Sequence, residues 1–231
     1  MRQLILVLIF VGAAAIDTTW GGENDSWKTS AQATYYFDSR DFNTAALQSS
    51  TKGLPLGFSV FGFVDLHSDQ KKSSARFDLS RYFVEYRLQR PLDPRWVGGI
   101  RGLSVQAEYD DFAGRGNEVL RFGLTYQHGL SRLAGNKGWL RLRVHPYETD
   151  DSGSQASLIY FIPLTTRLSI TGFADLNIDT SSPNRWVIEP QLNLRIDRRF
   201  QAVAEYRLNE YEGDNSRLDG SGLALGAKIL F

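Results

Sequence analysis

Hydrophobic and polar residues alternate along most of this chain, and the alternation recurs in short segments. In residues 103–110, Leu103, Val105, Ala107 and Tyr109 share one parity, and the residues between them are polar or acidic. Because successive side chains on a β-strand point to opposite faces, this period of two predicts a strand with one apolar and one polar face. No stretch of the sequence shows a helical period of comparable length, so the pattern predicts an all-β protein.

Twelve such segments can be counted, and turn-forming residues separate them. Clusters of Gly, Pro, Asn, Asp and Ser mark the turns. The longest connection, from Arg90 to Gly102, has room for a short helical turn. The predicted strands are 28–37, 44–50, 58–67, 77–89, 103–110, 118–128, 139–148, 155–164, 168–179, 185–197, 200–211 and 222–231.

Alternation alone fits two architectures. A soluble β-sandwich buries its apolar faces between two sheets, whereas a membrane β-barrel turns its apolar face to lipid and its polar face inward. The last segment, from Gly222 to Phe231, has one fully apolar face and ends on an aromatic residue, which resembles the assembly signal of bacterial outer-membrane proteins. The even strand count and a spacing of about 18 residues per strand also fit a barrel. We therefore predict a twelve-stranded antiparallel transmembrane β-barrel of the outer-membrane type.

The N-terminus predicts export. A basic start is followed by an apolar run from Leu4 to Gly12 and then by Ala13, Ala14 and Ala15, as in a secretory signal peptide. The apolar run is shorter than the ~20 residues that a spanning helix needs. We expect residues 1–15 to be the signal peptide and residues 16–231 to form a single barrel domain in the cell outer membrane.

Charge and composition narrow the function. The chain carries 26 basic and 26 acidic residues and no cysteine. The zero net charge argues against a nucleic-acid partner, which would favour a basic excess. Many of the charges lie on the polar parity, where oppositely charged side chains could pair inside a narrow lumen. Five aromatic residues lie on the apolar parity, where some should form interfacial girdles: Tyr82, Tyr86, Tyr109, Trp186 and Tyr206.

Several short motifs resemble the nucleoside-specific channel-forming proteins of the outer membrane, the Tsx-like family. They are, in order, 58–65 with its aromatic-Gly-aromatic-x-Asp arrangement, 83–85, 160–165, 172–175 and the closing strand. No single motif is specific, and their order carries the resemblance. It implies a twelve-stranded barrel that passes nucleosides.

The candidate site is a set of aromatic and charged side chains on the lumen parity. Rings can stack on a nucleobase or sugar, and the charged groups can hydrogen-bond its hydroxyls. The alternatives are that the rings fill a narrow barrel and that the charges form a structural ladder. The predicted lumen-wall residues are Phe61, Phe63, Asp65, Phe83, Glu85, Arg87, Phe173, Asp175, Glu189, Arg195 and Arg207, with Trp139 as a further candidate ring.

The lead function is diffusion of small polar, nucleoside-like solutes. A narrow porin for other solutes, a structural or adhesion barrel with a plugged lumen, and a lipid-modifying barrel enzyme remain alternatives. An enzyme is not expected, because none of the three histidines lies in a local motif with Ser and Asn or Asp. No cofactor is implied, and no metal-ligand spacing is present. The acidic runs 110–111, 148–151 and 212–214 could bind Ca²⁺ weakly but fit solvated loop tips better.

We expect both termini to be periplasmic, so that the acidic connections after odd-numbered strands face outward. The partners expected are outer-membrane lipid, a small polar solute, and the barrel-assembly machinery, which would bind the strand from Gly222 to Phe231.

Overall fold

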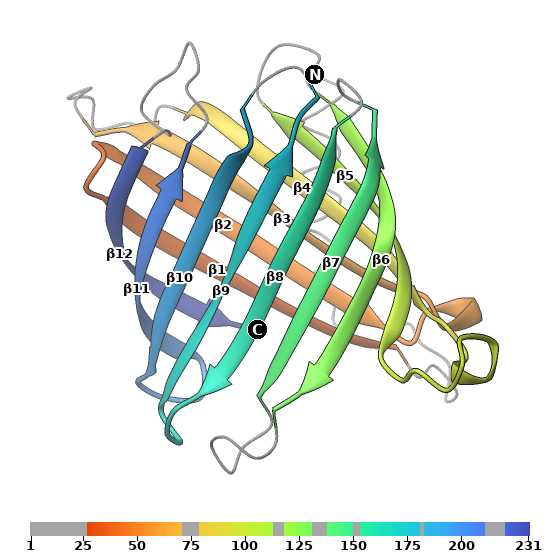
Figure 1. Cartoon of the computed structure of the whole chain (residues 1–231). Coiled ribbons are helices and arrows are strands. Elements are labelled where there is room, and N and C mark those ends of the chain that lie inside the picture. Colours follow the sequence, from red (N-terminus) through yellow and green to blue (C-terminus); the bar gives the residue numbers. More distant parts are fainter. Residues whose placement is uncertain are drawn as a thin grey trace.

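The structure, a computed structural model, describes residues 27–70, 79–112, 118–130, 138–149, 153–180, 183–210 and 220–231. These residues form twelve strands, which confirms the predicted number and order (Figure 1). The strands are β1 (Lys28–Asp38), β2 (Phe42–Lys52), β3 (Ser59–Asp69), β4 (Leu79–Pro91), β5 (Leu103–Phe112), β6 (Val119–Gly129), β7 (Trp139–Glu148), β8 (Ser154–Pro163), β9 (Leu168–Ile178), β10 (Arg185–Arg195), β11 (Phe200–Asn209) and β12 (Gly220–Leu230). The predicted signal peptide lies outside the described residues.

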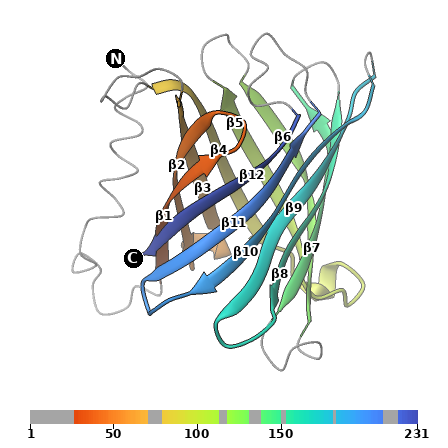
Figure 2. The ribbon, with the colours of Figure 1, turned by 90° about the vertical axis from the view of Figure 1, so that its left-hand side faces the viewer.

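The twelve strands close into one antiparallel barrel, in which each strand pairs with its sequence neighbours (Figure 2). The barrel closes where β1 pairs with β12, with Gln32 opposite Leu230 and Asp38 opposite Ala224. The C-terminal strand therefore pairs with β1 and β11, which supply backbone hydrogen-bond partners at both of its edges. The predicted fold class is confirmed.

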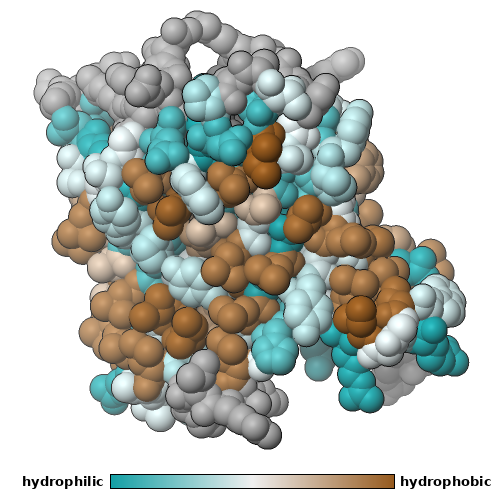
Figure 3. Space-filling model, viewed as in Figure 1, coloured by the Kyte–Doolittle hydropathy of each residue, from teal (hydrophilic) through white to brown (hydrophobic). Residues whose placement is uncertain are grey.

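The apolar parity faces outward. On β10, Leu192 is 43% exposed while the next residue, Asn193, is 4% exposed. The same pattern holds on β7, where Leu142 and Val144 are exposed and Arg143 lies between them, buried. Apolar side chains therefore cover much of the outer surface (Figure 3). A surface of this kind suits lipid and not water, as in outer-membrane barrels.

Two glycines on the outer face allow tyrosine rings to lie flat against the sheet. A Cβ atom on Gly62 would lie 2.7 Å from a ring carbon of Tyr86 on the neighbouring strand. A Cβ atom on Gly172 would similarly lie 2.8 Å from the hydroxyl oxygen of Tyr160. Each ring covers backbone that the glycine leaves bare, which explains why the aromatic-Gly-aromatic motif of β3 needs its glycine.

The connections fall at two ends. Those after β1, β3, β5, β7, β9 and β11 lie at one end, here called the odd end, and the others lie with the C-terminus at the even end. At the even end, the predicted helical turn is present as η2 (Pro94–Trp96), and η1 (Pro55–Gly57) joins β2 to β3. The β10–β11 hairpin is closed by Asp197, whose pKa is lowered because the backbone N–H groups of Phe200 and Arg199 donate to its carboxylate. Among the described residues, no helix has the length and apolar character needed to cross a bilayer.

Candidate functional site

The lumen is lined by two charged walls with aromatic seams between them. We call β4–β7 the first charged wall, and β10–β12 together with β1–β3 the second charged wall. In the closed strand order, β3 and β4 adjoin on one side of the barrel, and β8 and β9 separate the walls on the other.

Glu108 on β5 is the centre of the first charged wall. Its Oε2 accepts hydrogen bonds from Arg87 Nε at 2.9 Å and Arg143 Nη1 at 2.7 Å, and its Oε1 accepts from Arg121 Nη1 at 3.2 Å. Arg121 also pairs with Asp110 and, at 2.7 Å, with Glu148. The three guanidinium groups come from β4, β6 and β7, so a single carboxylate ties four neighbouring strands together.

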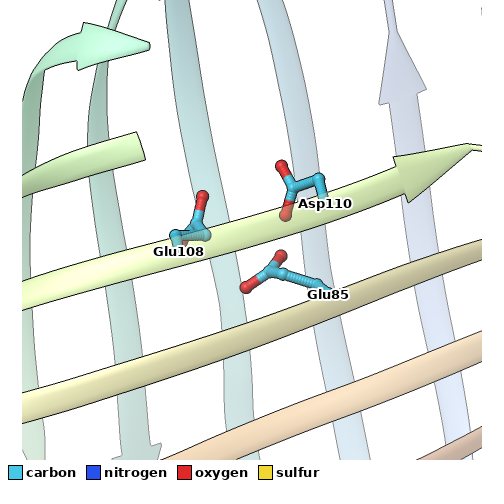
Figure 4. A group of neighbouring side chains, drawn as sticks. All are labelled: Glu85, Glu108 and Asp110. Carbon is cyan, nitrogen blue, oxygen red and sulfur yellow. The ribbon is translucent and has the colours of Figure 1, made fainter. Parts of the chain in front are cut away.

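Glu85, Glu108 and Asp110 form the tightest acidic group found among the described residues. Their ligand oxygens all lie within 4.8 Å of one another (Figure 4). However, Arg87 pairs with Glu85, and Arg121 pairs with Asp110, in addition to the contacts of Glu108. The positive charge that three close carboxylates require is therefore already supplied by guanidinium groups, which makes this a paired wall and not a metal centre. Asp110 lies on β5 in the lumen, as the predicted strand 103–110 and its polar parity indicated, and not in an acidic loop tip with Asp111.

Arg207 on β11 organises the second charged wall. It donates to Glu205 Oε1 at 2.5 Å, to Asp38 Oδ2 at 3.3 Å and to Thr44 Oγ1 at 3.2 Å. Beside it, Lys228 Nζ on β12 donates to Gln191 Oε1 at 2.7 Å and Asn193 Oδ1 at 2.9 Å. Gln191 in turn donates to the hydroxyl of Tyr36 at 2.5 Å and to Glu205 at 2.6 Å. The network therefore crosses the β1–β12 closure from inside.

The first aromatic seam joins the two walls at β3 and β4. Phe61 and Phe63 have ring centroids 6.0 Å apart, and Phe63 and Phe83 have centroids 5.3 Å apart. The guanidinium of Arg87 lies 5.0 Å from the ring centroid of Phe61. Asp65 is paired with Phe83 across the strands, so rings and charged groups share one stretch of wall, as the antiparallel order of the two strands predicted.

The second aromatic seam lies on β7–β9. Trp139 is paired with Phe161, and Ile159 is paired with Phe173, so all four share the lumen parity. The guanidinium of Arg141 lies 5.3 Å from the Trp139 ring centroid. Phe161 and Ile159 were not predicted as lumen residues, although their parity on β8 was available as a signal.

The predicted site residues are brought together in two groups, with one exception. Glu85, Arg87 and Asp175 associate with the first charged wall, since Arg143 and Arg87 are the cations that attract Asp175. Asp65, Glu189 and Arg207 belong to the second charged wall, where they interact electrostatically. Phe61, Phe63, Phe83 and Phe173 line the seams. Arg195 lies apart, exposed at the even end of β10, where it donates to the backbone carbonyl of Thr166.

Some buried lumen atoms have no hydrogen-bond partner among the described residues. Arg143 is 2% exposed, yet its Nε and Nη2 lack such a partner, and so does Oδ1 of Asp175. Buried polar groups of this kind need water or a solute. Because these atoms are almost inaccessible to solvent, their partner would be a bound water or a solute group inserted between the neighbouring side chains.

Comparisons with known proteins identify similar folds among solved structures. No protein-family model matches the sequence, and no curated protein matches it. Among solved structures, the KdgM porin is similar with a TM-score of 0.56 and 12% identity over 87% of this chain and 99% of that one. A KdgM porin in complex with disordered oligogalacturonate has a TM-score of 0.54 at 12% identity, with the same coverage. The NanC porin has a TM-score of 0.56 at 9% identity, over 88% of this chain and 99% of that one. The fold is that of the KdgM and NanC porins.

Proposed function

We propose that this protein is an outer-membrane channel through which small polar solutes diffuse. The observation that carries the proposal is the contrast between its two surfaces: an outer face of exposed leucine, valine and aromatic side chains, and a lumen of charged and amide groups. This is the arrangement of a lipid-embedded pore. The porin fold supports the same conclusion.

The proposed solutes are nucleoside-like. The half-buried rings of Phe61, Phe63 and Phe83 lie on the lumen face of the first aromatic seam, with Asp65 opposite Phe83 and Arg87 over the Phe61 ring. A heterocycle that stacks there would place its hydroxyls near Asp65 or Arg87. Stacking of a base on an aromatic ring contributes about 1–3 kcal/mol. The resemblance of the β3 motif to nucleoside-specific channels supports this choice of solute.

The test is ionic current through the refolded protein in a planar bilayer. We expect a steady salt current that added nucleoside blocks at millimolar concentration. Phe83→Ala should weaken the block by about 5- to 150-fold in solute concentration, the equivalent of one stacked base. It should leave the salt current equal or larger, since a smaller side chain widens the passage.

Phe122→Ala is the matched control, because Phe122 is a phenylalanine exposed on the outer face of β6. This variant should keep both the current and the block of the unmodified protein. A current that no nucleoside blocks would exclude the nucleoside assignment but keep the channel. The absence of any current would favour the barrel with a plugged lumen.

Acidic sugars are a second candidate solute. The KdgM porin was solved with oligogalacturonate, a polymer of carboxylate-bearing sugars. In this chain, two donor nitrogens of Arg143 have no hydrogen-bond partner among the residues that the structure describes, and Arg87 and Arg141 lie close enough for mutual repulsion. A carboxylate placed among these guanidinium groups would accept the unused hydrogen bonds. Block by galacturonate oligomers, weakened in Arg143→Gln and unchanged in Phe83→Ala, would select this candidate over nucleosides.

A lipid-modifying enzyme receives no comparable support. His67 is buried in the lumen, where its Nδ1 lies 2.9 Å from Thr44 Oγ1, and His145 is fully buried beside Gln106 and Gln155. His128, which is exposed at the even end, stacks on the ring of Tyr126.

A further inference from the structure

The connection between β4 and β5, residues 92–102, exposes large apolar side chains beyond the barrel wall. Trp96 is 75% exposed and Ile100 is 50% exposed. In Figure 1, this connection extends sideways from the even end at the lower right and does not continue along the strands. The corresponding part of Figure 3 shows apolar surface with hydrophilic surface along its lower edge. A lumen entrance has no need of such side chains, and water disfavours them.

The connection is held in this position by its own backbone. Leu92 N donates to Leu103 O at 2.9 Å, and Gln127 N on β6 donates to Gly102 O at 2.9 Å, so the base is fixed to two strands. At the tip, Asp93 accepts from the backbone N–H of Arg95 and starts η2. Gly98 and Gly99 have φ values of +66° and +84°, which turn the chain back with open space around them. The exposed Trp96 and Ile100 are therefore presented by a defined turn.

The same connection and its neighbours are basic. Arg95 and Arg101 are exposed beside Trp96 and Ile100. Arg90 lies 5.6 Å from the ring centroid of Phe58, which links this connection to the turn that contains η1. That turn exposes Leu56, which is 77% accessible. Among the described residues at the even end, the exposed acidic side chain is Asp197, and Asp93 is half-buried. The exposed basic side chains there are Lys28, Lys52, Arg90, Arg95, Arg101, Arg167, Arg195, Arg198 and Arg199.

We propose that the 92–102 connection lies in the headgroup region of the bilayer leaflet at the even end and binds anionic phospholipid there. Trp96 and Ile100 enter the boundary between headgroups and acyl chains. Arg101 contacts lipid phosphate, joined by Arg95, whose Nε and Nη2 are also hydrogen-bonded to the Asp93 carboxylate. Tryptophan at this depth keeps its indole N–H near water while its ring is in lipid, and arginine extends its charge to the phosphates. The basic side chains favour anionic headgroups over zwitterionic ones.

The proposal depends on the barrel being in a membrane but not on which solute the lumen takes. The chain contains no cysteine, so a single introduced cysteine can carry an environment-sensitive dye. We place it at Ile100→Cys, with Leu192→Cys as the deep control on the outer face and Thr180→Cys as the control beyond the other end. Each protein is refolded into vesicles of phosphatidylcholine with or without phosphatidylglycerol. Folding is verified by circular dichroism and by the shift of the folded barrel in gel electrophoresis.

We expect the fluorescence of the dye at position 100 to be protected from quenching by aqueous iodide. Lipids brominated near the headgroup should quench it strongly. Lipids brominated deep in the acyl chains should quench the dye at position 100 weakly. The same lipids should quench the dye at position 192, the deep control, strongly. Brominated phosphatidylglycerol should quench position 100 several-fold more than the same mole fraction of brominated phosphatidylcholine. This excess should disappear in a variant that also carries Arg95→Gln and Arg101→Gln, and in high salt.

Two results would overturn the proposal in a correctly folded barrel. Iodide quenching of position 100 equal to that of the Thr180→Cys control would place the connection in water, where the apolar tip is free for a protein partner. Equal quenching by the two brominated lipids would remove the preference for anionic phospholipid. A chain that fails to insert at all would instead contradict the membrane placement of the barrel under the proposed function.

Discussion

Charged side chains in the lumen form ion pairs and hydrogen bonds across strands. Glu108 shows how many of these contacts a single carboxylate can hold together. Its carboxylate accepts from Arg87, Arg121 and Arg143, and its side chain is almost fully buried. A buried charge is costly unless it is paired and hydrogen-bonded, so these residues are stable only as a set. Removing one member of the set leaves the buried charges of the others without an opposite charge to pair with.

Glu108→Gln should therefore destabilise the barrel and change its selectivity together. An amide cannot compensate three guanidinium groups, and breaking a buried ion pair costs about 3–5 kcal/mol. Urea unfolding in vesicles, followed by tryptophan fluorescence, measures the free energy of unfolding. The reversal potential in a salt gradient should shift toward anion selectivity, since the lumen gains one net positive charge.

Glu118→Gln serves as the control, because Glu118 is exposed at the odd end. It should change the unfolding free energy by no more than ~0.5 kcal/mol. A Glu108→Gln barrel as stable and as selective as the unmodified one would show that water, and not the carboxylate, compensates the three arginines.

The strands themselves could be predicted from the sequence, because a period of two depends only on neighbours along the chain. On β10, the apolar parity identified Leu192 as outward and Asn193 as inward, as observed. The network around Arg143 could not be predicted in the same way. Its partner Glu108 is two strands away, and whether two lumen side chains meet depends on the stagger between strands. The register shifts next to His67 and Phe122 change that stagger and have no sequence signal of their own.

The outward assignment of β10 leads to a prediction about stability. Leu192→Arg should lower the free energy of unfolding in vesicles by about 2–4 kcal/mol, since it places a charge in the hydrocarbon near the middle of the strand. The matched control is Ser169→Arg on β9, whose half-buried side chain faces the lumen opposite Asn193. Its cost should be much smaller because the guanidinium remains in the polar lumen.

Asn193 itself is unsuitable as the control, since it accepts a hydrogen bond from Lys228 and donates one to Thr171. An equal loss of unfolding free energy in Leu192→Arg and Ser169→Arg would mean that β10 and β9 do not separate lipid from lumen as the exposures indicate.

The whole barrel is electrically asymmetric, although its net charge is zero. The even end is rich in exposed arginine and lysine. The described acidic residues in and next to the connections at the odd end are Asp38, Asp41, Asp69, Asp111, Glu118, Glu148, Asp179 and Glu210. The basic ones are Arg40, Arg81 and Arg185. Fields from such rims concentrate counter-ions at each entrance. Cations should accumulate at the odd end and anions at the even end.

This asymmetry predicts that the pore rectifies ionic current. When the compartment at the odd end is positive, cations enter through the acidic rim and anions enter through the basic rim, so both accumulate inside and the current is larger. With the opposite polarity, both are depleted and the current is smaller.

This rectification should be clear at 0.05 M salt and vanish at 1 M, where the Debye length falls to about 3 Å. Replacing Arg167, Arg198 and Arg199 with Gln should reduce the ratio of the two currents at low salt while leaving the current at 1 M unchanged. Equal currents at both polarities in oriented single channels, with the odd end identified by a biotin on Thr180→Cys, would show that the rim charges do not reach the ion path.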